Sequence, residues 1–360
     1  MPVVTGRPAA RQAREPGTPP RSLVALASAA LALATGVAIW LLPTKAGGDQ
    51  SLPGLAARAG VTASGLVTRS SAGQTPARGP AASPTGRPSG FVTFVNTVQD
   101  PLFTLPEAAG KDHVRWFTLG HLTTGRKECV PMWGGTQEQG GNLVADRLDR
   151  LRAVGGDAGL AFGGPVGREL AAACTDLDRL IAAYRQAIGT FDATYIDFEV
   201  QDPANAATVL RRARAIATLQ REAAAKGRPL TVSFTLPVTG TGLAPSDQTM
   251  LRSTREAGAE ITAVNLLAAV GPESGLARDR LRPVASAVRA AQPQIAESLG
   301  EPVAWRRIAL TPVLSSSHDL TPANAHRLIA FAGRNKLAWL SVRGAAPTPN
   351  VARFLTSATR

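Results

Sequence analysis

The chain has 360 residues, of which 44% are hydrophobic, and its formal net charge is +13. This length accommodates one large domain with appendages, and the apolar content suffices for a core. Residues 1–90 hold nine basic and two acidic residues, which leaves 30 basic against 24 acidic residues in 91–360. Because much of the surplus charge lies in the amino-terminal quarter, the charge does not indicate a nucleic-acid-binding protein.

An uncharged run of 21 residues, SLVALASAALALATGVAIWLL, occupies 22–42 and is long enough to cross a bilayer as one helix. Four arginines precede it and only Lys45 follows closely, which places the amino-terminus on the cytoplasmic side. We therefore expect a basic cytoplasmic tail over 1–21, a transmembrane signal-anchor helix over 22–42 and an extracellular remainder at the cell membrane. The alternative is a secreted chain with a cleaved signal peptide, whose apolar core is usually about 7–15 residues.

Residues 43–90 are rich in Ala, Gly, Pro, Ser and Thr and show no sustained helical or strand period. Such a composition cannot bury enough apolar surface to fold, so it predicts a flexible linker. The folded domain is expected over 91–360.

From residue 91 onward, apolar β-rich runs alternate with amphipathic helical patterns. Strands are predicted at 91–98, 114–121, 158–164, 194–200, 230–238, 261–269, 307–314 and 337–344. Helical patterns include 142–154, 167–188, 207–225, 282–299 and 323–335. Eight strands in β/α alternation predict an α/β fold, the (β/α)8 barrel, in which the active site lies at the carboxyl ends of the strands.

One predicted strand carries the most informative residues. In FDATYIDFEV, residues 191–200, Asp197 and Glu199 stand two positions apart, so their side chains project from the same face of an extended segment. Repulsion between the carboxylates, with partial burial, raises the proton affinity of one of them, as a general acid requires. The alternative is a strand end whose acids are solvated or salt-bridged.

The spacing Asp192-Ala-Thr-Tyr195-Ile-Asp197-Phe-Glu199 resembles the DxxDxDxE signature of the family 18 glycoside hydrolases, the chitinase family. Tyr195 stands at the position of the middle Asp. Further segments, at 118–135, 155–174, 230–247 and 263–269, resemble the secreted actinobacterial branch of this family, and the resemblance covers about residues 91–345.

The resemblance implies substrate-assisted, retaining hydrolysis of chitin-type or other N-acetylated β-linked glycans. It implies that Glu199 is the general acid that protonates the glycosidic oxygen. It further implies that Asp197 orients the substrate's N-acetyl group as that group attacks the anomeric carbon, and that Asp192 supports Asp197. Tyr195 is expected among the residues that contact substrate.

Two segments depart from the family pattern. Where the family reads MAMDYG, with a Tyr that holds the N-acetyl oxygen, this chain reads Leu267-Ala-Ala-Val-Gly271. Where the last strand of the family ends in a Trp that floors the sugar subsite, this chain has Arg343. The alternative function is therefore a catalytically impaired carbohydrate-binding protein at the cell surface, while the retained acids favour the hydrolase.

Three further residues are candidate sugar contacts. Trp133, in the loop after the second strand, either stacks on a sugar ring or fixes its Gly-rich loop. Asp319 follows the seventh strand in SSSHDL, and Arg343 or another loop residue is expected to take over part of the sugar contact that the family Trp would otherwise make.

The four histidines show no metal-ligand spacing, and only His121 is placed to face the site. We predict no metal, no cofactor and no nucleic-acid partner, and we expect a monomer that binds a polysaccharide or oligosaccharide. The two cysteines, Cys129 and Cys174, lie in adjacent β/α units of an exported domain and predict a disulfide, the alternative being two buried thiols.

Overall fold

The computed structural model describes residues 87–357, except 101–102, 104, 113, 140–142, 272–279 and 303–304. The predicted tail, the predicted transmembrane helix over 22–42 and nearly all of the predicted linker lie outside these residues, as does His113. Within the described part of the chain, no helix has the length and apolar character needed to span a membrane.

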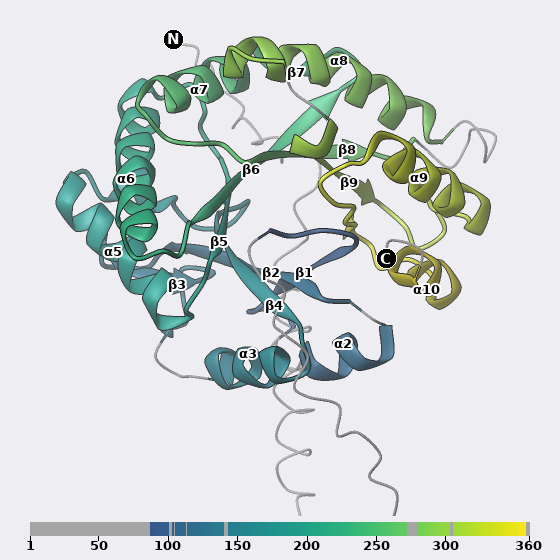
Figure 1. Ribbon diagram of the computed structural model, residues 1–360, viewed down its shortest axis with the longest axis horizontal. Helices are drawn as coiled ribbons and strands as arrows, with labels where there is room; N and C mark the ends of the chain where they lie inside the picture. Colours follow the sequence, from purple (N-terminus) through teal and green to yellow (C-terminus); the bar gives the residue numbers. More distant parts are fainter. Residues whose placement is uncertain are drawn as a thin grey trace, which may run out of the picture. The chain divides into compact units, whose positions relative to one another are not determined.

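Eight parallel β-segments form a closed barrel (Figure 1). Their order is β1 (Val92–Asn96), β2 (Trp116–Thr124), β4 (Asp157–Gly163), β5 (Tyr195–Glu199), β6 (Thr231–Thr239), β8 (Ala263–Ala269), β9 (Ile308–Leu314) and β10 (Arg343–Gly344). The ring closes at Leu340, which bridges Leu310 of β9 on one side and Phe91 beside β1 on the other. The predicted (β/α)8 barrel is therefore confirmed.

Each of the eight predicted strands overlaps one of these segments. Two short strands were not predicted: β3 (Pro131–Trp133) pairs antiparallel with β2, and β7 (Gly242–Leu243) pairs antiparallel with β6. Both extend barrel strands at their carboxyl ends, so they build the rim on the side where the acids of β5 lie.

Helices surround the strands on the outside of the barrel (Figure 1). They are α2 (Leu105–Asp112), α3 (Leu143–Ala153), α4 (Leu170–Ala173), α5 (Leu177–Thr190), α6 (Ala206–Ala225), α7 (Pro245–Glu256), α8 (Arg282–Leu299), α9 (Pro322–Asn335) and α10 (Pro349–Ser357), with a 3-10 turn, η2, at Trp305–Arg307. The single helix predicted over 167–188 is two helices, because the chain leaves α4 at Cys174 and Asp176 caps α5 by accepting the Arg179 amide at 2.9 Å.

The apolar core has two parts. The larger one lies between the barrel wall and the helices. The smaller one lies inside the barrel at the amino ends of the strands and consists of Val92, Trp116, Tyr195, Ala263, Ala309 and Trp339. This apolar plug closes the amino end of the barrel, so the polar interior above it faces the carboxyl ends of the strands.

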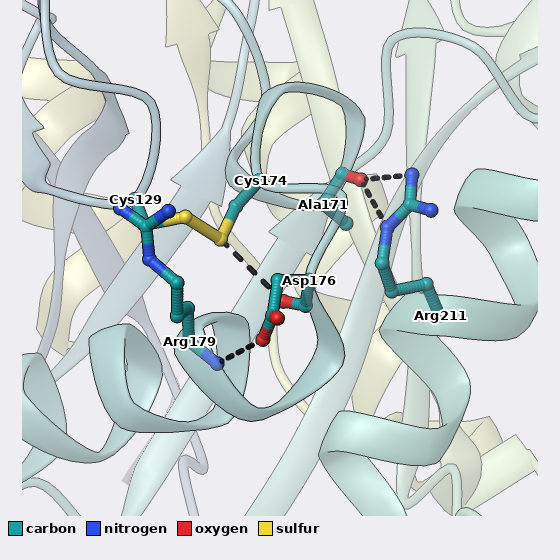
Figure 2. The surroundings of a disulfide bond; sticks show 6 residues. All are labelled: Cys129, Ala171, Cys174, Asp176, Arg179 and Arg211. Atoms are coloured by element: carbon teal, nitrogen blue, oxygen red, sulfur yellow. Dashed lines mark hydrogen bonds between the residues drawn. A yellow bond between two sulfur atoms is a disulfide. The ribbon is translucent and has the colours of Figure 1, made fainter.

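Cys129 and Cys174 form the predicted disulfide, with Cα atoms 4.9 Å apart (Figure 2). The bond joins the loop between β2 and β3 to the end of α4. The α4 side is held further by Arg211, whose guanidinium donates to the carbonyl of Ala171 at 2.7 and 2.9 Å. Two loops near the rim are therefore tied covalently to each other.

Candidate active site

Strand β5 places two acids inside the barrel. Side chains alternate along a strand, so Ile196 and Phe198 point to the core beneath the helices while Asp197 and Glu199 point inward. Phe198 stacks on Phe162 of β4, with ring centroids 5.6 Å apart, which fixes the rotation of the strand. Asp197 is 2% exposed, whereas the Glu199 side chain is 16% exposed, so Asp197 lies deep and Glu199 lies at the rim.

Hydroxyl groups hold Asp197. Ser233 of β6 donates to Oδ1, and Thr235 donates to Oδ2 at 2.7 Å. The chain of bonds continues around the wall, because Asn265 of β8 donates to Thr235 at 3.1 Å and Thr311 of β9 donates to Asn265 at 2.8 Å. Every hydrogen in this chain points toward Asp197, and such aligned bonds polarise one another.

Tyr195 supports the same carboxylate from below. Its Oη lies 2.9 Å from Ser233 Oγ, and Tyr195 must be the donor because the single hydroxyl hydrogen of Ser233 goes to Asp197. Burial raises the pKa of Tyr195 well above its usual value, which keeps the phenol protonated. Tyr195 is 2% exposed and packs against Trp339 in the apolar plug, so it lies beneath the acids. It does not reach the mouth of the barrel, the opening at the carboxyl ends of the strands, and so it is not placed to contact substrate as predicted.

The inner acid is the one with the raised proton affinity. Burial raises the pKa of Asp197 to about 6, although the hydrogen bonds from Ser233 and Thr235 act in the opposite direction. The nearby charge of Glu199 adds to the rise. The sequence predicted a raised proton affinity for one of the two carboxylates without saying which, and the structure assigns it to Asp197 and not to Glu199, the general acid that the family resemblance implies.

Glu199 lies between two basic side chains. His121 Nε2 is 2.8 Å and Arg343 Nη2 is 3.2 Å from Glu199 Oε2. Burial by itself raises the pKa of Glu199, but the hydrogen bond from His121 and the charge of Arg343 outweigh it and hold the pKa below its usual value. The free site therefore keeps Glu199 ionised near neutral pH.

Two glycines at the carboxyl end of β4 allow His121 to approach Glu199. Gly163 and Gly164 have φ angles of +91° and +83°. A Cβ on Gly164 would lie 2.4 Å from the His121 ring, and one on Gly163 would lie 2.2 Å from the carbonyl oxygen of Glu199. The pairing of β2 with β4 also shifts between Gly120 and Leu122, and such a bulge redirects a side chain, here that of His121.

Phe94 of β1 supports both basic groups. The guanidinium carbon of Arg343 lies 3.1 Å from the centroid of the Phe94 ring, a cation–π contact. The His121 ring lies 4.9 Å from the same centroid. Strands β1, β2, β5 and β10 thus build one cluster at the mouth, and Arg343 is part of it.

Asp192 does not belong to this cluster. It precedes β5 at the amino end of the strand, its side chain is 61% exposed, and it pairs with Arg228 at 2.6 Å. The hydrogen bond from Arg228 lowers the pKa of Asp192. The expectation that Asp192 supports Asp197 therefore finds no contact in the structure, because the chain reverses direction at Asp192, where φ is +47°.

Trp133 and Asp319 have structural surroundings. Trp133 is 2% exposed and packs on Phe191 with ring centroids 5.4 Å apart, so it fixes the loop after β2 and offers no face to a sugar. Asp319 is 5% exposed and accepts the amides of Ser315 and Ser316 at 2.7 and 2.9 Å, which folds the loop after β9. Neither side chain is presented to the mouth as a sugar contact.

Gly271, where the family resemblance would place a Tyr, is closely packed. The amide of Gly271 donates to the carbonyl of Arg280 at 2.9 Å, and a Cβ at Gly271 would lie 3.2 Å from that same oxygen. The backbone there has little space for a larger residue.

Five residues of the site were not predicted from the sequence: Phe94, Ser233, Thr235, Asn265 and Thr311. The last four are polar residues at inward positions of apolar strands, in LTVSFTLPV, ITAVNLLAA and RIALTPVL. A buried polar group needs a hydrogen-bond partner, so a polar residue in register with Asp197 on the next strand is a usable signal. Arg343 was found only because it departs from the family pattern.

The geometry suits proton transfer to a ligand at the mouth. Glu199 is the carboxyl group that a ligand reaches from solvent, and Asp197 lies just beneath it with both oxygens fixed. Two carboxyl groups whose pKa values differ are typical of sites that divide acid and charge-stabilising roles. Among the described residues, no group of three or more His, Cys, Asp and Glu side chains is arranged to hold a metal ion.

Comparisons with known proteins agree with this geometry. The chain matches no protein-family model. Over 181 residues it is 29% identical to the probable bifunctional chitinase/lysozyme of Escherichia coli (strain K12), an alignment that covers 49% of this chain and 20% of that protein. Over 171 residues it is 28% identical to endochitinase 11 of Metarhizium anisopliae, covering 46% and 32% of the two chains.

The fold is shared with a solved chitinase structure. The catalytic domain of the hyperthermophilic chitinase from Pyrococcus furiosus aligns with a TM-score of 0.62 and 22% identity, over 78% of this chain and 99% of that one. The alignments to the two sequence relatives span a third or less of their lengths. The barrel is thus similar to chitinases in sequence over about half of the chain and has the fold of a chitinase catalytic domain.

Proposed function

We propose that this domain is a chitinase-like glycoside hydrolase that cleaves β-linked glycans of N-acetylated sugars by a substrate-assisted, retaining route. The observation that carries the proposal is the placement of Asp197 and Glu199 on one inward face at the carboxyl end of β5, where barrel enzymes bind substrate. The similarity to proteins named chitinases supports the same chemistry.

In this reaction Glu199 is the general acid. The N-acetyl oxygen of the substrate bonds to the anomeric carbon while the bond from that carbon to the glycosidic oxygen breaks, and the proton of Glu199 passes to the departing oxygen. Water then opens the cyclic intermediate and returns a proton to Glu199. The 16% exposure of the Glu199 side chain at the rim fits a group that meets a leaving oxygen.

Asp197 orients the N-acetyl group. Hydroxyl donors hold both of its carboxylate oxygens, so its position is fixed before substrate arrives. A fixed acceptor loses little conformational entropy when the substrate amide binds, which favours the geometry of attack.

The alternative is a carbohydrate-binding protein without turnover. It is favoured by the two basic partners that keep Glu199 ionised and by the absence of the family Tyr at Gly271. Both features weaken acid catalysis while leaving a polar mouth able to bind sugar.

Glu199→Gln separates the two functions. The amide keeps the shape of the side chain and loses the transferable proton, so turnover of chitooligosaccharides should fall by about 10²- to 10⁴-fold while binding measured by calorimetry changes little. The matched control is Glu222→Gln, because Glu222 also pairs with an arginine but lies on α6, outside the site.

The outcomes are distinct. Wild type and the control should release product at equal rates. If wild type and Glu199→Gln bind sugar equally and neither releases product over long incubation, the hydrolase proposal fails and the binding protein stands. If neither binds, both are wrong.

A further inference from the structure

Arg343 is a cation built into the mouth of the barrel. Its guanidinium carbon lies over the Phe94 ring, and one nitrogen, Nη2, donates to Glu199 at 3.2 Å. Its other nitrogens, Nε and Nη1, have no hydrogen-bond partner among the described residues. The side chain of Arg343 is 17% exposed, so it is partly open to a ligand that enters the mouth.

The acid step changes the charge balance around Arg343. Glu199 must carry a proton in order to give one to the leaving oxygen. Once protonated, Glu199 no longer supplies the negative charge that faces Arg343. A largely buried cation without a counter-charge is unfavourable, so the reactive state of the site lacks one negative charge near Arg343.

We propose, on the basis of the hydrolase function above, that Arg343 selects a glycan that carries a carboxylate on the sugar beside the cleaved linkage. The substrate carboxylate takes the place of Glu199 as the partner of Arg343. Glu199 is thereby released from its ion pair and becomes able to hold the proton that it transfers.

The geometry suits a carboxylate in particular. A guanidinium can donate two parallel hydrogen bonds to a carboxylate, and the contact with Phe94 restricts the movement of Arg343 before the ligand arrives. A neutral chitin chain offers only hydroxyl and amide oxygens, which leave Arg343 with the charge of Asp197 but without a carboxylate in direct contact once Glu199 is protonated. Chitin is therefore the poorer substrate of this site.

The test compares matched substrates on the full-length protein. The first is an oligosaccharide that alternates N-acetylglucosamine with N-acetylmuramic acid, and the second is the same compound with its lactyl carboxylate methyl-esterified. We expect kcat/KM for the free acid to exceed that for the ester by about 10- to 100-fold, as is usual for a hydrogen bond to a charged group. In Arg343→Met the ratio should approach one.

Two controls isolate the charge of Arg343. Arg353→Met removes an exposed arginine of α10 whose side chain donates to Asn350, so this variant should keep the wild-type ratio. Arg343→Lys keeps the charge but not the planar fork, so it should retain only part of the preference. A change in the ratio of two substrates is not produced by a general loss of folded protein.

A second carboxylated substrate identifies where the charge sits. An oligosaccharide that alternates an N-acetylhexosamine with glucuronic acid carries its carboxylate on the ring, and the muramic acid compound carries it on an ether side chain. The one that shows the larger Arg343-dependent preference is the class that the site recognises. Chitotetraose, which is neutral, serves as the common reference.

The results separate this inference from the hydrolase proposal. If wild type cleaves chitotetraose and the ester as fast as both acids, the hydrolase stands and the role of Arg343 is refuted. If no substrate is cleaved, the hydrolase proposal fails, and the ratio of dissociation constants for acid and ester decides the role of Arg343. A ratio of about tenfold that is lost in Arg343→Met supports it, and equal binding overturns it.

Discussion

The barrel interior around Asp197 and the mouth around Glu199 each hold a largely buried carboxyl group, but they shift its pKa in opposite directions. Each region holds a carboxylate of β5, two residues apart in the chain. Asp197 receives hydrogen bonds from neutral hydroxyls, and burial raises its pKa to about 6. Glu199 meets His121 and Arg343, which hold its pKa below the usual value despite burial.

The difference shows that the partner strands, and not β5, set the chemistry of each acid. The partners of Asp197 come from β6 and those of Glu199 from β2 and β10. A hydroxyl donor satisfies a carboxylate without neutralising it, so desolvation dominates at Asp197. A cation compensates the charge, so attraction dominates at Glu199.

The largest expected effect is on stability at Asp197. Its pKa is about 6 in the folded chain and about 3.9 when unfolded, so the folded state binds more protons between these values. Stability contributed by this proton is present below about pH 4 and is lost as the pH rises through about 6, by roughly 3 kcal/mol. The free energy of unfolding, measured in urea across this pH range, should fall less steeply with rising pH in Asp197→Asn than in wild type.

Asp247 provides the matched control for that measurement. Burial raises its pKa to about 6 as well, but it lies on α7, and neither Asp197 nor Glu199 is among the groups that shift its pKa. Asp247→Asn should flatten the same part of the stability curve without changing turnover. Parallel curves for wild type and Asp197→Asn would show that Asp197 does not bind the extra proton.

A smaller effect is expected at the mouth. His121→Leu removes the hydrogen bond that lowers the pKa of Glu199 and leaves burial, which raises it. The basic limb of the kcat/KM profile should therefore move to higher pH. His326→Leu, on the outside of α9, is the control, and a limb that stays in place or moves down in His121→Leu would contradict the assignment.

The smallest effect is expected at the third acid of the motif. Asp192 and Arg228 form an exposed pair, and such pairs contribute about 0–1 kcal/mol. Asparagine tolerates the positive φ at this position, so Asp192→Asn should change the unfolding midpoint little and turnover not at all. A loss of turnover above about tenfold, beyond the change that one weak contact produces, would place Asp192 back in the site.

The order of strands was predictable from sequence because each barrel strand is an apolar run bounded by polar or glycine-rich segments. All eight predicted runs overlap barrel segments, and the last one is mostly an irregular stretch that pairs through Leu340. The break between α4 and α5 was not predicted, since the apolar period continues through Cys174. Asp176, the residue that caps α5 and separates the two helices, is a single polar residue within this pattern, so the sequence alone did not indicate a break there.

The site was only partly predictable for a related reason. Strand periodicity correctly puts Asp197 and Glu199 on one face, but it does not tell which neighbours they meet. Asp192 and Glu199 belong to one sequence motif and lie at opposite ends of β5. Trp133 illustrates the same limit, because an aromatic residue in a loop after a strand is equally compatible with a sugar contact and with a buried anchor.

The Cys129–Cys174 bond shortens the covalent path between the two partners of the mouth. His121 and Glu199 are 78 residues apart along the chain. Through the disulfide the path is eight residues from His121 to Cys129 and 25 from Cys174 to Glu199. Bringing the two side chains together from an unfolded chain then costs about 0.8 kcal/mol less in closure entropy. A single proteolytic cut between residues 130 and 173 would also leave both halves of the His121–Glu199 pair in one covalent molecule.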